Sequence, residues 1–350
     1  MDFKLGIFFV MAVLAVAMFL PMVDAEGEDP ELFTYRSQLD ENGMAVYREV
    51  SAATDIDGES MEFTIPFEPT MLFIAEEAAS EYADRTVQNA LAAVYLSNPM
   101  IPYLWNYPVT KIAVDPTVAE KGSEGTIYYE VESVAFTLAV PEGITAESMK
   151  ELEDALKKVS IKGDTDGKKV KSIMSYIDGL SYKKDEDGRI SNIYDAVVNG
   201  KTTSAGAAQA FTQLCILNNI QSITVAGENI TAKNEAVNFW NYVYLDDGHN
   251  KGSNVWYIVD AFYNESAGTA GSLTLIKYDG KSYSMGAALK TDLDLSSPND
   301  LSAPDVIDKK YVPPEEGPTF WDEYGEMVLI AVIGAILVLG MLYAVKTGNF

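Results

Sequence analysis

Residues 199–217 read NGKTTSAGAAQAFTQLCIL, and the helix that they predict decides how the whole chain is interpreted. Behind Ser204, apolar residues recur at helical spacing on one face: Ala207, Ala208, Phe211, Leu214 and Cys215. We therefore expect a helix over residues 204–217 with this face buried. Because Cys215 falls on the apolar face, we expect it to pack as a small hydrophobic side chain.

Three strand-like runs rich in β-branched and aromatic residues follow this helix, over residues 222–226, 239–245 and 255–260. The last two are separated by a polar turn that contains His249, the one histidine of the chain. Because turn tips face solvent, we expect His249 to be exposed. Upstream, the patterns predict helices over residues 75–96, from Thr145 and from Asp166, and one or two strands over 126–140. Helices followed by an antiparallel meander indicate an α+β domain.

These segments carry a resemblance to the transglutaminase-like (papain-related) superfamily. There a cysteine opens a helix that continues G-x-A-x-x-F, a histidine lies in a strand motif like H-x-W-N-x-V, and an aspartate lies near W-Y-x-V-D. This chain has Ser204 before its helix motif, then Asn238-Phe239-Trp240-Asn241-Tyr242-Val243, then Val255-Trp256-Tyr257-Ile258-Val259-Asp260. The similarity covers residues 191–260, and a looser one to the N-terminal region of bacterial transglutaminase-like lipoproteins covers 87–105. The resemblance implies a papain-like α+β core, in which the helix packs on an antiparallel sheet.

Two of the three catalytic positions differ from the superfamily pattern. Ser204 stands where the resemblance implies the cysteine, and Asn238 stands where it implies the histidine, whereas Asp260 matches the aspartate. A serine hydroxyl needs a general base, and an amide does not accept a proton near neutral pH. Asp260 is then a carboxylate with no imidazole to orient. We therefore expect a catalytically silent site.

The resemblance leaves three functional readings open. The first is binding or scaffolding, in which the former substrate groove holds a peptide, cell-wall material or a surface protein; Trp240, Trp256 and Tyr242 are then the candidate groove residues. The second is a surface hydrolase or amidase that uses Ser204 as its nucleophile. The third is a purely structural spacer domain.

Other motifs are weaker. Asn229-Ile230-Thr231 and Asn264-Glu265-Ser266 fit the N-glycosylation pattern, so Asn229 and Asn264 are candidate acceptors. Asp164-Thr165-Asp166-Gly167 and Asp185-Glu186-Asp187-Gly188 resemble fragments of calcium loops, but neither continues to the closing glutamate. We interpret both as acidic turns and expect neither a metal site nor a cofactor.

Both ends of the chain are hydrophobic. Lys4, an apolar run over residues 5–20 and small residues up to Ala25 predict a secretory signal peptide, with an uncleaved anchor as the alternative. Residues 327–345 carry no charge and would span about 28 Å as a helix, close to the hydrocarbon thickness of a bilayer. Lys346 follows this run and predicts a cytoplasmic tail. We thus expect a single-pass protein of the cell membrane with its body outside.

The chain is accordingly divided into six parts: a signal peptide (1–25), an N-terminal α/β region (26–140), a transglutaminase-like core (141–290), an acidic proline-rich stalk (291–326), a transmembrane helix (327–345) and a tail (346–350). The formal net charge of −27 argues against nucleic acid as a partner, because phosphate binding needs clustered Lys and Arg. One cysteine excludes an intrachain disulfide.

Overall fold

A computed structural model describes residues 33–69, 71–105, 112–121, 126–182, 191–229, 238–246, 254–260, 283–285, 301–306 and 311. The predicted signal peptide, transmembrane helix and tail lie outside these residues, as do His249 and Asn264. Among the helices that the structure describes, none has both the length and the apolar character needed to cross a membrane.

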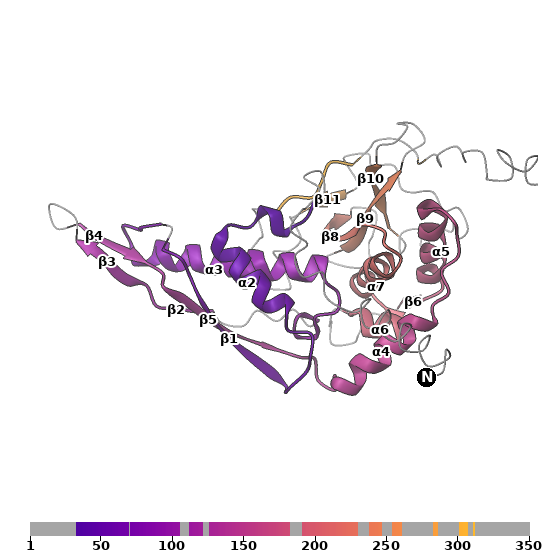
Figure 1. Cartoon of the computed structure of the whole chain (residues 1–350), viewed down its shortest axis with the longest axis horizontal. Coiled ribbons are helices and arrows are strands. Elements are labelled where there is room, and N and C mark those ends of the chain that lie inside the picture. The colour runs from indigo at the N-terminus through magenta and orange to yellow at the C-terminus, as the bar shows by residue number, and fades with distance from the viewer. Residues whose placement is uncertain are drawn as a thin grey trace, which may run out of the picture. The chain divides into compact units, whose positions relative to one another are not determined.

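In the described chain, runs of helices and runs of strands follow one another (Figure 1). The helices are η1 (Arg36–Gln38), α2 (Glu41–Ser51), α3 (Glu76–Ser97), η2 (Pro102–Leu104), α4 (Ala146–Lys158), α5 (Asp166–Asp178), α6 (Ile193–Val197) and α7 (Ser204–Leu217). The strands are β1 (Ser60–Pro66), β2 (Ala113–Val114), β3 (Thr117–Lys121), β4 (Ile127–Glu130), β5 (Ser133–Ala139), β6 (Ser181–Tyr182), β7 (Lys201–Thr202), β8 (Ser222–Asn229), β9 (Asn238–Asp246), β10 (Asn254–Val259) and β11 (Tyr283–Met285). The α+β prediction is confirmed, and α3, α4, α5 and α7 coincide with the four predicted helices.

The sheet that positions the site has the strand order β10-β9-β8-β11, with β9 antiparallel to β8. In this register Asn241 lies opposite Thr224, and Trp240 lies opposite Val225. Six successive residues of β9 from Asn238 are buried, so both faces of this strand are covered. A strand buried on both faces has no polar side to alternate with, which explains its nearly continuous run of apolar and aromatic residues.

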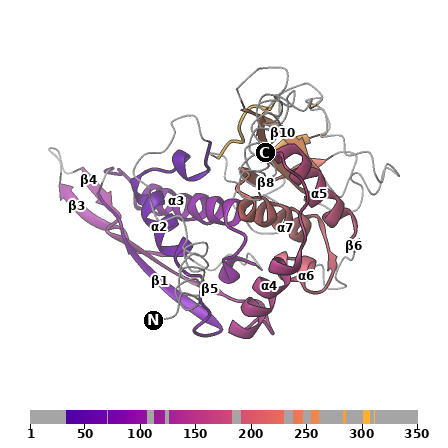
Figure 2. The same cartoon turned by 45° about the vertical axis from the view of Figure 1, so that its right-hand side comes forward.

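Two hydrophobic clusters share this sheet. The first joins α2, α3, β1 and β5 with sheet residues such as Val225, Trp240 and Trp256. The second joins α4, α5, α6 and α7 with sheet residues such as Val243 and Tyr257. The helices α5 and α6 both contact α7, and α4 contacts α6 (Figure 2). Elements on either side of residue 140, the expected boundary between two regions, thus pack with the same sheet and fall in one compact unit.

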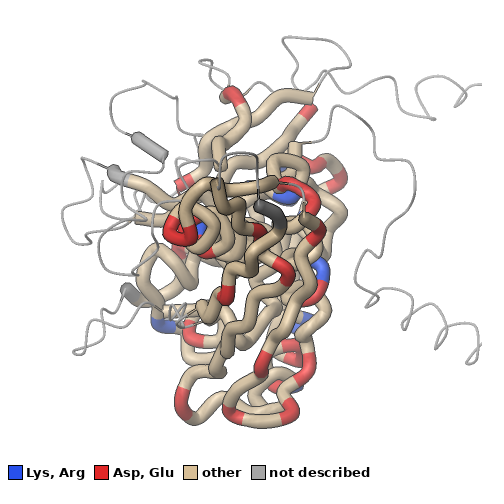
Figure 3. The backbone as a smooth tube through the Cα atoms, turned by 90° about the vertical axis from the view of Figure 1, so that its left-hand side faces the viewer, with Lys and Arg blue, Asp and Glu red and all other residues tan. Residues whose placement is uncertain are grey.

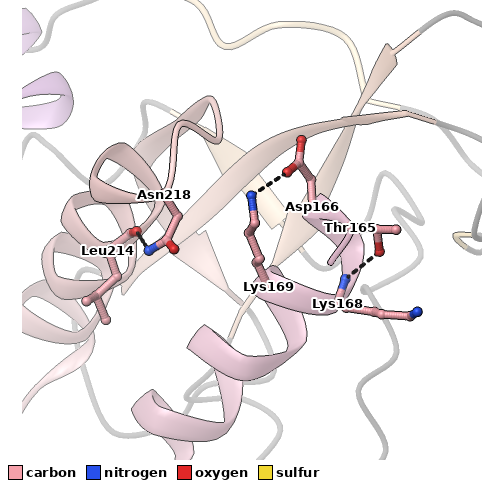
Figure 4. A network of polar contacts seen from close by, with 6 residues as sticks. All are labelled: Thr165, Asp166, Lys168, Lys169, Leu214 and Asn218. Atoms are coloured by element: carbon pink, nitrogen blue, oxygen red, sulfur yellow. Dashed lines mark hydrogen bonds and ion pairs between the residues drawn. The ribbon is translucent and has the colours of Figure 1, made fainter. Parts of the chain in front are cut away.

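Side chains at the helix ends satisfy main-chain groups that the helices leave without partners. Thr145 accepts a hydrogen bond from Ser148 N and forms a capping box that starts α4. Thr165 Oγ1 accepts from Lys168 N at 3.4 Å at the start of α5, and Asn218 Nδ2 donates to Leu214 O at 2.8 Å at the end of α7 (Figure 4). The N-terminal caps typically contribute about 1 kcal/mol each.

Part of the stretch expected as a stalk packs on the domain. Leu301 is only 6% exposed and belongs to the first hydrophobic cluster. Val306 forms a parallel bridge with Trp256 of β10, and the ring of Tyr311 meets that of Tyr257 edge-on at 5.4 Å. Residues 301–306 and Tyr311 therefore belong to the folded domain rather than to a linker.

Candidate functional site

A buried network of hydroxyl groups fixes the chain just before α7. Ser191 Oγ lies 2.9 Å from Thr202 Oγ1 and 2.7 Å from Thr203 Oγ1, and it also accepts a hydrogen bond from Thr203 N at 2.7 Å. All three side chains are buried. Thr203 has an extended backbone and is the last residue before the helix. The network therefore sets where Ser204 begins the first turn.

The first turn of α7 lies directly on the preceding segment at Gly206. A Cβ atom at this position would lie 2.4 Å from both Asn192 O and Thr202 Oγ1. One turn later, Gln209 Oε1 accepts a hydrogen bond from Ile193 N at 3.0 Å. The glycine thus permits a close approach that any larger residue would prevent, as expected where backbone packs against a helix.

Strand β9 is fastened to α7 by polar contacts inside the core. Asn241 Nδ2 donates to Ala208 O at 3.0 Å and to Thr212 Oγ1 at 2.9 Å, and Thr212 Oγ1 lies 2.9 Å from Thr224 Oγ1 of β8. Buried polar groups are stable only when hydrogen-bonded, so these contacts hold the helix and both strands in one register. This arrangement brings the start of β9 to the start of α7.

Ser204 contacts the first residues of β9. Phe239 N donates a hydrogen bond to Ser204 Oγ at 3.2 Å, which places Asn238 next to the residue that Ser204 contacts. Asp260 directly follows β10. Ser204, Asn238 and Asp260 are all buried, with 5%, 7% and 5% of their surface exposed.

The cavity beside Ser204 is small. Its lining includes Ser204 and Asp260, and the other lining residues are Ala207, Ala208, Phe239, Trp240 and Asn241. Its volume is about 10 Å³, roughly the space that one water molecule needs. Asn238 is adjacent in the chain but is not among the lining residues. The structure therefore brings Ser204 and Asp260 to one water-sized cavity.

All three candidate groove residues are buried in the first hydrophobic cluster. Trp256 stacks at an angle against Tyr244, with ring centroids 5.1 Å apart, and meets Phe33 edge-on at 6.1 Å. Tyr242 is 5% exposed and belongs to the first hydrophobic cluster, as Trp256 does. Only Trp240 lines the cavity, and it is 1% exposed. For Trp256 and Tyr242 the packing differs from the groove that the sequence suggested.

Cys215 is fully buried in the second hydrophobic cluster, which confirms the expectation from helical spacing. Burial raises the pKa of its thiol far above the ordinary value, because the apolar surroundings disfavour the thiolate. A thiol that stays protonated is neither a nucleophile nor a metal ligand.

The remaining motifs are described only in part. Asp164 Oδ1 pairs with Lys168 Nζ at 2.9 Å, and that hydrogen bond is the main reason why the pKa of the exposed Asp164 carboxyl is lowered. In the described part of the chain, no three His, Cys, Asp or Glu side chains gather closely enough to hold a metal ion. Asn229 is the last residue of β8 and pairs with Tyr283 of β11. The segment Asp185–Gly188 lies outside the described residues.

The chemistry of the site follows from its atoms. Ser204 offers a hydroxyl whose oxygen accepts a main-chain hydrogen bond, and Asp260 offers a carboxyl group at the same cavity. A serine nucleophile requires a base of suitable pKa within hydrogen-bond reach, normally an imidazole. The one histidine of the chain, His249, falls between β9 and β10 in the sequence, outside the described residues.

Comparisons with known proteins give structural similarity only. No family model matches the sequence, and no curated protein matches it significantly. Among solved structures, the chain is similar to a candidate cysteine protease from Cytophaga hutchinsonii (TM-score 0.28, 13% identity, covering 51% of this chain and 68% of that one). It is also similar to a TGase (0.27, 11%, 62% and 56%) and to the periplasmic domain of TgpA from Pseudomonas aeruginosa bound to ethylmercury (0.23, 12%, 62% and 77%). At these scores, what the site can do rests on its own residues.

Proposed function

We propose that this chain is a transglutaminase-like domain with a silent catalytic position, which acts by binding or scaffolding at the cell surface. The observation that supports this most strongly is the Ser204 hydroxyl at the first position of α7, which accepts a hydrogen bond from Phe239 N. The neighbouring side chains in the sequence motifs are an amide, Asn238, and a carboxylate, Asp260. Neither replaces an imidazole as the base of an acyl-transfer reaction.

A fluorophosphonate probe tests the loss of catalysis directly. Such a probe reacts with serine hydroxyl groups that a base activates, so we expect no labelling of the folded protein. A serine hydrolase in the same tube serves as the positive control. Labelling that disappears in Ser204→Ala would instead establish the alternative, a surface hydrolase or amidase with Ser204 as its nucleophile.

Restoring the thiol and the imidazole tests whether Ser204 and Asn238 occupy the cysteine and histidine positions of the superfamily. In Ser204→Cys/Asn238→His we expect the thiol pKa to fall below the ordinary value of about 8.5, because an adjacent imidazolium and the helix N-terminus both favour the thiolate. The single variant Ser204→Cys is the control, and its buried thiol should titrate higher. A folded double variant with an unshifted thiol pKa would show that the motif is misaligned.

A purely structural role is the second candidate function. Two observations favour it: the cavity beside Ser204 has a volume of about 10 Å³, and Trp240 and Trp256 are buried. Titration of the folded protein with short peptides and cell-wall fragments separates the candidates. Binding should shift the amide resonances of Phe239 and Asn241 in NMR spectra, whereas a spacer domain should leave them unchanged.

The cell-surface location rests on the sequence. The uncharged run over residues 327–345 and the positive charge of Lys346 support a single span with the domain outside. We expect the full chain to fractionate with membranes and its domain to be digested by protease added to intact cells. Deleting residues 327–345 should release the protein in soluble form, and continued membrane association would contradict the proposed anchor.

A further inference from the structure

The segment Leu301–Val306 is held at three points along its length. At its start, the Leu301 side chain enters the first hydrophobic cluster. At the next two residues, Ser302 forms hydrogen bonds with Gln38, and Ala303 packs against the same cluster. At its end, Val306 bridges to Trp256.

Gln38 recognises the main chain of this segment rather than a particular side chain. Its Nε2 donates to Ser302 O at 2.9 Å, and its Oε1 accepts from Ser302 N at 2.8 Å. The carboxamide therefore offers the same donor and acceptor that a neighbouring β-strand would offer. A third bond, from Ser302 Oγ to Gln38 Oε1 at 3.0 Å, is the only one that depends on the serine side chain.

The surfaces that receive the segment are fixed by the rest of the domain. Gln38 ends η1, and the chain just before η1 is tied to the central sheet: Tyr35 OH donates to Thr224 O at 3.1 Å, and Gln221 Nε2 donates to Phe33 O at 3.1 Å. Trp256 lies on β10, the strand at one end of the sheet β10-β9-β8-β11. Main-chain bonding at a sheet edge, with pockets for selected side chains, is how many domains bind extended peptides.

We infer that Gln38, the edge of β10 at Trp256 and the part of the first hydrophobic cluster that contacts Leu301 form a binding site for extended peptides, which the chain's own residues 301–306 occupy as a releasable latch. The ligand class is an extended segment with an aliphatic residue at its first position, small residues at the next two and an aliphatic residue at the sixth. This inference goes beyond the proposed function, because none of its contacts involves Ser204, Asn238 or Asp260.

Competition with the latch determines how the site is tested. The latch and the surfaces that receive it belong to one chain, so the latch binds intramolecularly. An intramolecular ligand has a high effective concentration, and a free peptide must outcompete it. The site should therefore bind a free peptide well only after the latch has been weakened.

Ser302→Pro weakens the latch, because proline lacks the N–H group that donates a hydrogen bond to Gln38 Oε1. The substitution lies in the latch and leaves the receiving surfaces unchanged. The probe is a fluorescein-labelled peptide with the sequence of residues 299–308, NDLSAPDVID, and binding is followed by fluorescence anisotropy. We expect full-length Ser302→Pro to bind this peptide at least about 10-fold more tightly than the unaltered chain. Adding Gln38→Ala should abolish the gain.

A second measurement follows release of the latch itself. Asp305 lies within the latch and is a cleavage site for endoproteinase Asp-N. We expect cleavage there to be about 10-fold faster in Ser302→Pro and in Gln38→Ala than in the unaltered chain, with the helical circular dichroism unchanged. Equal cleavage rates in all three proteins would overturn the inference. So would peptide binding by Ser302→Pro no tighter than by the unaltered chain, even though its latch is cleaved faster.

Discussion

At the scale of single residues, Gly206 carries the strictest steric requirement at the candidate site. The space for a side chain is taken by Asn192 O, Thr202 Oγ1 and Ser191 Oγ, at 2.4, 2.4 and 2.9 Å from a hypothetical Cβ. One of these atoms belongs to the backbone and the others to a buried hydroxyl network, so none can move freely. The first turn of α7 can therefore take this position only because residue 206 has no side chain.

Gly206→Ala should destabilise the domain by about 1–3 kcal/mol, the usual cost of overpacking a core. The urea unfolding midpoint measures the effect, provided that the slope of the transition is unchanged. Gly58→Ala is the matched control, because a Cβ there would meet no atom closer than 3.8 Å. Equal stability of the two variants would contradict the close packing described for Gly206.

Cys215 should be unreactive in the folded protein. Its thiol is buried and its pKa is raised, chiefly by desolvation. We expect no reaction with Ellman's reagent at pH 8 in the folded chain and complete reaction in urea. Rapid labelling under native conditions would show that the thiol is accessible.

The same burial gives the stability a predictable dependence on pH. Desolvation also raises the pKa of the Tyr35 and Tyr95 hydroxyls. A group whose pKa is raised in the folded state contributes stability that is fully present below its unfolded pKa and is lost as pH rises through the folded pKa. The free energy of unfolding should therefore fall above about pH 8.5, where the unfolded thiol ionises first, and fall faster above about pH 10, where unfolded tyrosine ionises. Urea denaturation between pH 7 and 11 measures this.

At the scale of elements, the contact between α7 and β9 depends on one polar side chain in an apolar strand. Asn241 bonds to Ala208 O and Thr212 Oγ1 of the helix and reaches Ile223 O of β8 at 3.4 Å. It is 2% exposed, so water cannot replace these partners. The start of β9, with its contact to Ser204, is positioned through this side chain.

Asn241→Ala should cost about 2–3 kcal/mol, because it removes buried hydrogen bonds and leaves Thr212 in a dry environment with one partner fewer. Asn199→Ala is a control of the same residue type, since Asn199 makes an exposed bond to Asp195 and should cost less than about 0.5 kcal/mol. Thermal unfolding followed by circular dichroism compares them. If both variants behaved alike, the helix and the strand would be held by apolar packing alone.

The elements around the site could be predicted because their patterns are local. Apolar spacing gave α7 and the burial of Cys215, and runs of β-branched and aromatic residues gave β8, β9 and β10. Phe239, whose N–H group bonds to Ser204, directly follows Asn238, which the resemblance assigns to the same site as Ser204. The network of Ser191, Thr202 and Thr203 could not be foreseen, since no periodic pattern marks three hydroxyl groups that converge only when β7 and α7 are in place.

Local patterns could predict neither the size of the cavity nor the existence of the latch, because both depend on contacts between residues far apart in the sequence. Whether a tryptophan lines a groove or fills a core depends on which distant side chains cover it, as Phe33 covers Trp256. Residues 301–306 read as a linker because they offer only two large apolar side chains, Leu301 and Val306. Their binding partner Gln38 lies 264 positions away.

At the scale of the whole molecule, acidic residues dominate the surface chemistry. The sequence has 52 Asp and Glu against 25 Lys and Arg, and Figure 3 shows acidic positions spread along the described backbone. Many of the described ion pairs are exposed contacts between neighbours in one helix, such as Lys157 with Glu153. Exposed pairs of this kind contribute at most about 1 kcal/mol, so stability rests on the two hydrophobic clusters.

Residues 301–306 also bear on where the domain can be cut for expression. An uncovered strand at the end of a sheet presents open hydrogen-bonding groups to other chains and is a common origin of aggregation. Val306 lies against β10, the strand at one end of the sheet β10-β9-β8-β11. A protein that stops at residue 290, where composition alone suggests the domain ends, should precipitate or form higher oligomers in size-exclusion chromatography, whereas one that extends past Tyr311 should stay monodisperse.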